Sequence, residues 1–168
     1  MAQAFPFFKK EGHKKQVMEV ESIGMNYKQV LETKAIEKNW SQAALQVYLT
    51  ISERLQKDGP LTIHAGVGGI SFYKKTGKDM TFLVRFVAVP KRLPSQMGYL
   101  EFRKDSLQRW IDIDDLVEKI KYQAGPDTLF REGKVWCGLF FPLSRTEEIT
   151  DLIRRRIVSR VGNSIKGS

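Results

Sequence analysis

The residues with the clearest chemical potential are two acids in the middle of the chain. Asp79 lies on an expected hairpin turn, and Glu101 and Arg103 lie on the next expected strand. Two carboxylates can hold Mg²⁺ while a basic side chain positions water, which is the chemistry of metal-dependent phosphodiester cleavage. Arg103 stands where such sites need a lysine, and this spacing is common by chance. A metal-dependent nuclease is therefore kept only as an alternative function.

The glycine-containing turns do not form phosphate-binding loops. The segment 66–69, Gly–Val–Gly–Gly, precedes an expected strand rather than the helix whose N-terminus holds phosphate in such sites. The pair Gly77 and Lys78 lacks both the upstream glycine and a hydroxyl after the lysine. Both segments fit hairpin turns better.

The remaining candidates predict no metal or nucleophilic site. His13 and His64 are the only histidines, and Cys137, the only cysteine, lies in the apolar run 135–141. They are too few for a typical zinc site, and we expect a buried, inert thiol. The acids at 112–118 are expected on the solvated face of a helix. We therefore predict a protein without catalytic residues, metal or cofactor.

Charge is the strongest functional signal. The 168 residues include 28 Lys and Arg against 19 Asp and Glu, so the net charge is +9. Such an excess attracts polyanions, either nucleic acid or an anionic lipid surface. Basic side chains gather on an expected hairpin, a proline-containing loop and the last helix, and they form one surface only if the fold brings them to one face. The expected nucleic-acid-binding residues are Lys74, Lys75, Lys78, Lys91, Arg92, Arg154, Arg155, Arg156 and Arg160.

The first fifteen residues predict a second binding element, an arm that combines phenylalanines with lysines. Aromatic rings favour the bilayer interface, and lysines are attracted to anionic lipid. The same combination also suits stacking on unpaired bases. The expected membrane-binding residues are Phe5, Phe7, Phe8, Lys9, Lys10, Lys14 and Lys15.

The hydrophobic pattern predicts the scaffold as a single α+β domain, a mostly antiparallel β-meander packed with about three α-helices. We place a flexible arm at 1–15, the domain at 16–162 and a tail at 163–168. A chain of this length buries enough surface to fold without disulfides. Strands are expected at 16–20, 45–52, 61–65, 70–74, 80–89, 99–103 and 135–141.

The expected helices have recognisable ends. Asn26 with Gln29, and Ser144 with Glu147, have the spacing of capping pairs. Between them, the apolar residues of 107–120 repeat every three or four positions and predict a helix of about four turns. In this arrangement we expect Phe82 and Trp110 to be buried, so that replacing either by alanine costs ~3–5 kcal/mol.

The N-terminal quarter of the chain resembles a known class of structural protein. After the segment 5–15, it is similar to the strand-then-helix opening of a rhabdoviral matrix core, and the small matrix proteins of plant rhabdoviruses are similar in size and charge. The resemblance implies a virion protein that self-associates and links ribonucleoprotein to a membrane. No proline-rich budding motif is present in the arm, so the resemblance does not extend to budding. The residues that carry it are Val17, Glu19, Val20, Tyr27, Val30, Asn39 and Trp40.

The sequence therefore predicts a non-enzymatic assembly protein that binds nucleic acid or nucleoprotein and an anionic membrane surface, as a viral matrix protein does. A sequence-tolerant nucleic-acid-binding protein is the first alternative, and the nuclease is the second. We expect a homo-oligomer. Because no signal peptide or membrane-spanning run is visible, we expect an intracellular location, in the cytoplasm or nucleus of a host cell, and in the virion.

Overall fold

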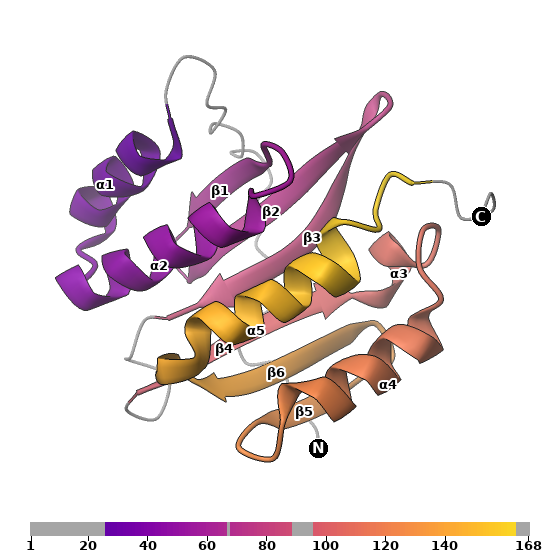
Figure 1. Cartoon of the computed structure of the whole chain (residues 1–168). Helices are drawn as coiled ribbons and strands as arrows, with labels where there is room; N and C mark the ends of the chain where they lie inside the picture. The colour runs from indigo at the N-terminus through magenta and orange to yellow at the C-terminus, as the bar shows by residue number, and fades with distance from the viewer. Residues whose placement is uncertain (1–25, 67, 89–95, 164–168) are drawn as a thin grey trace.

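A computed structural model describes residues 26–66, 68–88 and 96–163 (Figure 1). In these ranges six strands form one antiparallel sheet in the order β1-β2-β3-β4-β6-β5. The α+β class and the antiparallel sheet are therefore confirmed, and the meander holds from β1 to β4, after which β6 precedes β5 in the sheet. The strands are β1 (Thr62–Gly66), β2 (Gly69–Thr76), β3 (Asp79–Val87), β4 (Met97–Arg103), β5 (Leu129–Glu132) and β6 (Trp136–Pro142).

The described helices outnumber the three that were predicted. They are α1 (Tyr27–Lys38), α2 (Gln42–Leu55), α3 (Lys104–Leu107), α4 (Ile113–Ala124) and α5 (Thr146–Ile153). A 3₁₀ turn η3 (Leu143–Arg145) precedes α5, and a π-helical turn η4 (Arg154–Val158) continues it. Figure 1 shows α2, α4 and α5 on the same face of the sheet. None of the described helices is both long and apolar enough to cross a bilayer.

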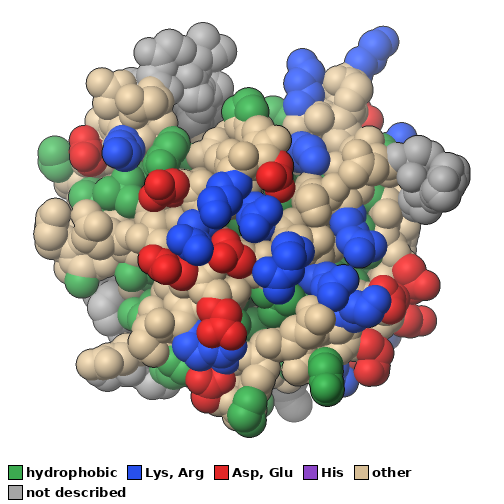
Figure 2. All heavy atoms as spheres, viewed as in Figure 1, with side chains coloured by type: hydrophobic (Ala, Val, Ile, Leu, Met, Phe, Trp, Pro, Cys, Tyr) green, Lys and Arg blue, Asp and Glu red, His purple; other side chains and the backbone are tan. Residues whose placement is uncertain are grey.

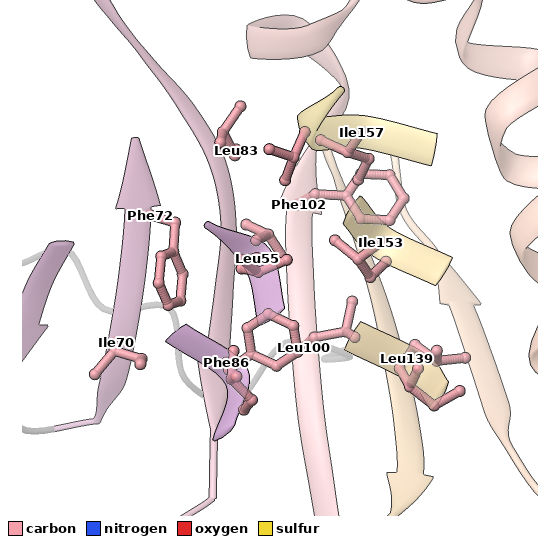
Figure 3. Packing of buried hydrophobic residues seen from close by; sticks show 14 of the residues in the cluster. Leu55, Ile70, Phe72, Leu83, Phe86, Leu100, Phe102, Leu139, Ile153 and Ile157 are labelled. Atoms are coloured by element: carbon pink, nitrogen blue, oxygen red, sulfur yellow. The ribbon is translucent and has the colours of Figure 1, made fainter. Parts of the chain in front are cut away.

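The core lies between the sheet and these helices (Figure 3). Leu55 of α2 and Ile153 of α5 face Phe86 and Leu100 from the central strands, and all four are fully buried. The pairing of β2 with β3 shifts between Phe72 and Tyr73, so that β3 has one extra residue there. This bulge lets the consecutive residues Leu83 and Val84 both reach the core.

The predicted strand 45–52 is wrong, because these residues belong to helix α2. The Ser41 side chain caps α2 by accepting a hydrogen bond from the Ala44 N–H at 3.0 Å. The apparent alternation placed Tyr48 on a polar face, yet Tyr48 is fully buried and its hydroxyl accepts a hydrogen bond from the Ala88 N–H. When Tyr48 is counted as a core residue, the buried positions of 44–55 have the three- and four-residue spacing of a helix. The buried residues are Ala44, Leu45, Tyr48, Ile51, Ser52 and Leu55.

The predicted helix over 107–120 is also corrected, because α3 ends at Leu107 and α4 begins only at Ile113. Asp112 breaks the segment because its carboxylate accepts the Asp115 N–H at 3.2 Å and so begins α4 at Ile113. The capping pair of Ser144 and Glu147 does not form, and α5 begins without a side-chain cap.

Strand β5 was not predicted. Phe82 and Trp110 are only partly buried, so the cost expected for their replacement was too high.

Other predicted elements are confirmed. Asn26 caps α1 by accepting the Gln29 N–H at 3.0 Å, and Val30, Leu31 and Ala35 form its buried side. The predicted strands at 61–65, 70–74, 80–89, 99–103 and 135–141 correspond to β1, β2, β3, β4 and β6. The predicted strand at 16–20 lies outside the described residues.

Candidate polyanion-binding surface

A single lysine joins the β2–β3 hairpin to the end of the last helix. The Lys74 ammonium donates hydrogen bonds to the backbone carbonyls of Val158 at 2.9 Å and Val161 at 2.8 Å. Carbonyls at a helix C-terminus lack intrahelical partners and carry partial negative charge, so a lysine is favourable there. Burial lowers the pKa of Lys74, while the nearby Asp58 carboxylate opposes this effect. Two basic segments that are far apart in sequence are therefore held together.

The turn after α2 also contacts the end of the last helix and Lys74. Asp58 accepts a hydrogen bond from Arg154 at 3.1 Å, and its charge also acts on Lys74. Arg54 of α2 forms a two-pronged ion pair with Asp151 of α5, at 3.1 and 2.9 Å, which fixes the two helices side by side. Lys57 is close enough to Asp151 to lower the pKa of that carboxyl, although Arg54 is the main cause.

The three consecutive arginines of η4 point in different directions and have different roles. Successive residues of a helix project about 100° apart. Arg154 turns towards Asp58, and Arg156 donates a hydrogen bond to Gln123 of α4 at 3.0 Å. Arg155, between them, is exposed. In η4 the Ser159 N–H bonds to the Arg154 carbonyl, five residues back, which is a π-helical turn of the kind often found at functional sites.

We call this region the basic surface. Figure 2 shows its Lys and Arg side chains as a band over the end of α2, over α5 and η4, and towards the hairpin. Arg155 and Arg160 are exposed, and neither forms an ion pair with any residue that the structure describes. They are thus available to an external anion. The basic surface comprises Lys57, Lys74, Lys78, Arg154, Arg155, Arg156 and Arg160.

The structure thus brings together most of the predicted nucleic-acid-binding residues. Lys75 is the exception, because it alternates with Lys74 and so lies on the opposite side of the hairpin. Lys91 and Arg92 lie outside the described residues. The same is true of the predicted membrane-binding residues, Phe5, Phe7, Phe8, Lys9, Lys10, Lys14 and Lys15.

The linking role of Lys74 leads to a stability prediction. Lys74→Met keeps most of the apolar stem but leaves two carbonyls without their donor, so we expect a loss of about 1–3 kcal/mol in the free energy of unfolding. Urea denaturation measures this loss. Lys75→Met, at the exposed neighbouring position, is the matched control and should change stability by less than about 0.5 kcal/mol. Equal effects of the two substitutions would contradict the linking role.

The acids of the nuclease alternative are not brought together. Glu101 pairs across the sheet with Arg85, whereas Asp79 lies at the other end of β3. At roughly 3.4 Å per residue, the two carboxylates are on the order of 20 Å apart. Within the described ranges, no group of three or more His, Cys, Asp or Glu side chains could hold a metal ion.

Sequence reasoning missed a polar row on the sheet face opposite the helices. Cross-strand pairing aligns His64, Ser71, Arg85 and Glu101 across β1, β2, β3 and β4. Glu101 is fully buried, and burial raises its pKa to about 7, although Arg85 and the Tyr99 hydroxyl act in the opposite direction. The alternation of side chains along each strand predicts which residues share a face of that strand. Which residues of different strands lie side by side follows only from the register between the strands.

Glycine at position 138 makes room beside Glu101. A Cβ atom at Gly138 would overlap the ring and hydroxyl of Tyr99, so the Tyr99 ring occupies the space next to the carboxylate. Burial raises the pKa of Tyr99, which keeps its hydroxyl protonated at physiological pH. The neighbourhood of Glu101 therefore contains a neutral hydroxyl on one side and the Arg85 charge on the other.

Comparisons of the chain with protein-family models, with curated proteins and with solved structures found no match.

Proposed function

We propose that this chain is a structural, non-enzymatic protein that binds the phosphate backbone of nucleic acid through the basic surface. The observation that carries the proposal is the pair of hydrogen bonds from Lys74 to the end of the last helix. They hold hairpin and helix charges on one face, as a polyanion requires.

The form of the surface favours phosphate contacts over recognition of particular bases. Arg155 and Arg160 are exposed, while Lys74 and Arg154 form hydrogen bonds within the fold. Guanidinium groups bind phosphate oxygens in a two-pronged manner. Contacts of this kind position a nucleic acid but carry no sequence information directly. Binding is thus expected to tolerate many sequences and to weaken with salt.

This proposal is the nucleoprotein-binding half of the matrix-like role that the sequence predicts. The membrane-binding half depends on the segment 5–15, outside the described residues, and stays a prediction from the sequence. Self-association also stays a prediction.

The proposal is tested by removing the two available arginines. We expect Arg155→Ser with Arg160→Ser to weaken binding to a fluorescent oligonucleotide about tenfold or more, because each lost charge-assisted contact is worth roughly 1.5 kcal/mol or more. Fluorescence anisotropy at about 100 mM salt measures the affinity. The stability of the variant should match that of the wild type, since neither side chain forms an ion pair in the described part of the chain.

The matched control removes the same charge elsewhere. Lys28→Ser with Lys38→Ser changes two lysines of α1, which Figure 1 shows well apart from η4. If affinity follows net charge alone, both variants weaken equally and the basic surface is not the binding site.

A further inference from the structure

An acidic side chain lies among the cations of the basic surface. Asp58, in the turn after α2, accepts one hydrogen bond from the Arg154 guanidinium at 3.1 Å. Burial lowers the pKa of Lys74, and the Asp58 charge acts on the same ammonium in the opposite direction. Figure 2 shows acidic side chains in contact with the band of Lys and Arg side chains. The free protein therefore places a carboxylate of its own beside two cations of the basic surface.

The contact between Asp58 and Arg154 is of a kind that an external anion can replace. The Asp58 side chain is 54% exposed, and a single hydrogen bond joins the pair. Ion pairs with this exposure contribute little to stability, because water screens the charge. The pair of Arg54 and Asp151 differs, since two hydrogen bonds hold it and the Asp151 side chain is only 21% exposed. Asp58 is thus held loosely, whereas Asp151 is part of the packing of α2 against α5.

The two cations beside Asp58 have donors that their described contacts leave unused. An ammonium has three N–H groups, and Lys74 uses two of them on the Val158 and Val161 carbonyls. In the described part of the chain, Arg154 forms one hydrogen bond, to Asp58. Its Nε atom is buried, so an anion can reach Arg154 through the terminal nitrogens that now face Asp58. An anion in the place of the Asp58 carboxylate can therefore bind both cations.

The other described acids near the basic surface do not form ion pairs with these two cations. Glu147 and Asp151 both pair with Arg54 of α2. Asp79 is exposed at the start of β3. Among the described residues, Asp58 is therefore the acid whose removal frees a cation of the basic surface and leaves the contact between α2 and α5 intact.

We propose that Arg154 and Lys74 form a phosphate subsite, which Asp58 occupies in the free protein and from which a phosphate of the nucleic-acid backbone displaces it. A strand that Arg155 and Arg160 already hold brings its neighbouring phosphates close to Arg154, at a high effective concentration. Asp58 thus competes with the nucleic acid from within the protein and lowers its affinity. The inference rests on the proposed function and deepens it, because it names a residue that regulates the same surface.

The test removes the competing charge and measures binding of the full chain to a fluorescent single-stranded oligonucleotide by anisotropy. We expect Asp58→Asn to bind about threefold to tenfold more tightly than the wild type, the effect of losing one surface ion pair and one repulsive charge. Glu32→Gln is the matched control, because it removes the same charge from an exposed position of α1, which Figure 1 shows well apart from η4. At about 100 mM salt, which screens distant charges, the control should tighten binding by less than about twofold. In an Arg154→Met background, the gain from Asp58→Asn should fall to that of the control.

The outcomes separate this inference from the proposed function. If Asp58→Asn binds no more tightly than the control, or if its gain persists in the Arg154→Met background, the subsite is overturned. The proposed function still stands in that case, provided that the variant with both serine substitutions binds weakly. No binding of the oligonucleotide by the wild type overturns both proposals. Should Asp58→Asn fail to fold, Arg154→Met decides: a loss of affinity no greater than that of Lys28→Ser overturns the subsite, and a larger loss supports it.

Discussion

Glu101→Gln is expected to stabilise the fold by about 3 kcal/mol at pH 8 and by less than about 1 kcal/mol at pH 5. Glu101 is fully buried, and burial raises its pKa from 4.5 to about 7. At pH 8 the wild-type protein therefore holds a buried carboxylate whose charge is costly. Glutamine has the shape of the protonated acid and never ionises, so the cost disappears.

The pH dependence has a definite sign. Between about pH 4.5 and 7 the folded protein holds a proton on Glu101 that the unfolded chain has released, so wild-type stability falls as pH rises through this window. The variant lacks this fall. Urea denaturation of both proteins at several pH values between 5 and 8 measures the difference. Parallel stability curves for the two proteins would show that Glu101 ionises normally and that its burial has no cost.

Phe86→Ala is expected to cost about 3–5 kcal/mol of stability, which is a large part of the total for a domain of this size. Phe86 is fully buried in the centre of the core, and its ring meets those of Phe72 and Phe141 edge to face, with centroids 6.2 and 6.4 Å away. Removal of the ring leaves a cavity that surrounding β-strands cannot close easily.

Phe82→Ala is the informative comparison, because Phe82 lies on the same strand but on the sheet face opposite the helices. Its ring is only partly buried, so less apolar surface is lost and we expect a clearly smaller cost. Thermal or urea denaturation of the two variants gives both values. A cost for Phe82→Ala equal to that for Phe86→Ala would mean that the sheet face opposite the helices is as important to stability as the core.

The sequence was informative where a local pattern decides the structure. Asn26 was recognised as a cap because its side chain needs only the backbone N–H three residues later. The β-rich run that became β3 was recognised because both of its faces are apolar. Period-two alternation failed at 45–52 for a physical reason: a buried tyrosine hydroxyl with a hydrogen-bond partner is a core residue, and the pattern counted it as polar.

The candidate sites needed information that the sequence does not contain. That Lys74 reaches Val158 and Val161 depends on the packing of the hairpin against the last helix, which joins residues 84 and 87 positions apart. The polar row of His64, Ser71, Arg85 and Glu101 depends on the register of four strands. Basic residues could be named from the sequence, but which of them are engaged within the fold and which are available could not.

The most direct test of the central claim is the affinity of the full chain for a single-stranded oligonucleotide, measured between about 50 mM and 200 mM salt. If the basic surface binds phosphates, the logarithm of the affinity falls linearly with the logarithm of the salt concentration, with a slope of about 0.7 for each phosphate contact. The slope should be smaller in the variant with Arg155→Ser and Arg160→Ser. No binding at 50 mM salt, or a slope that these substitutions leave unchanged, would contradict the account.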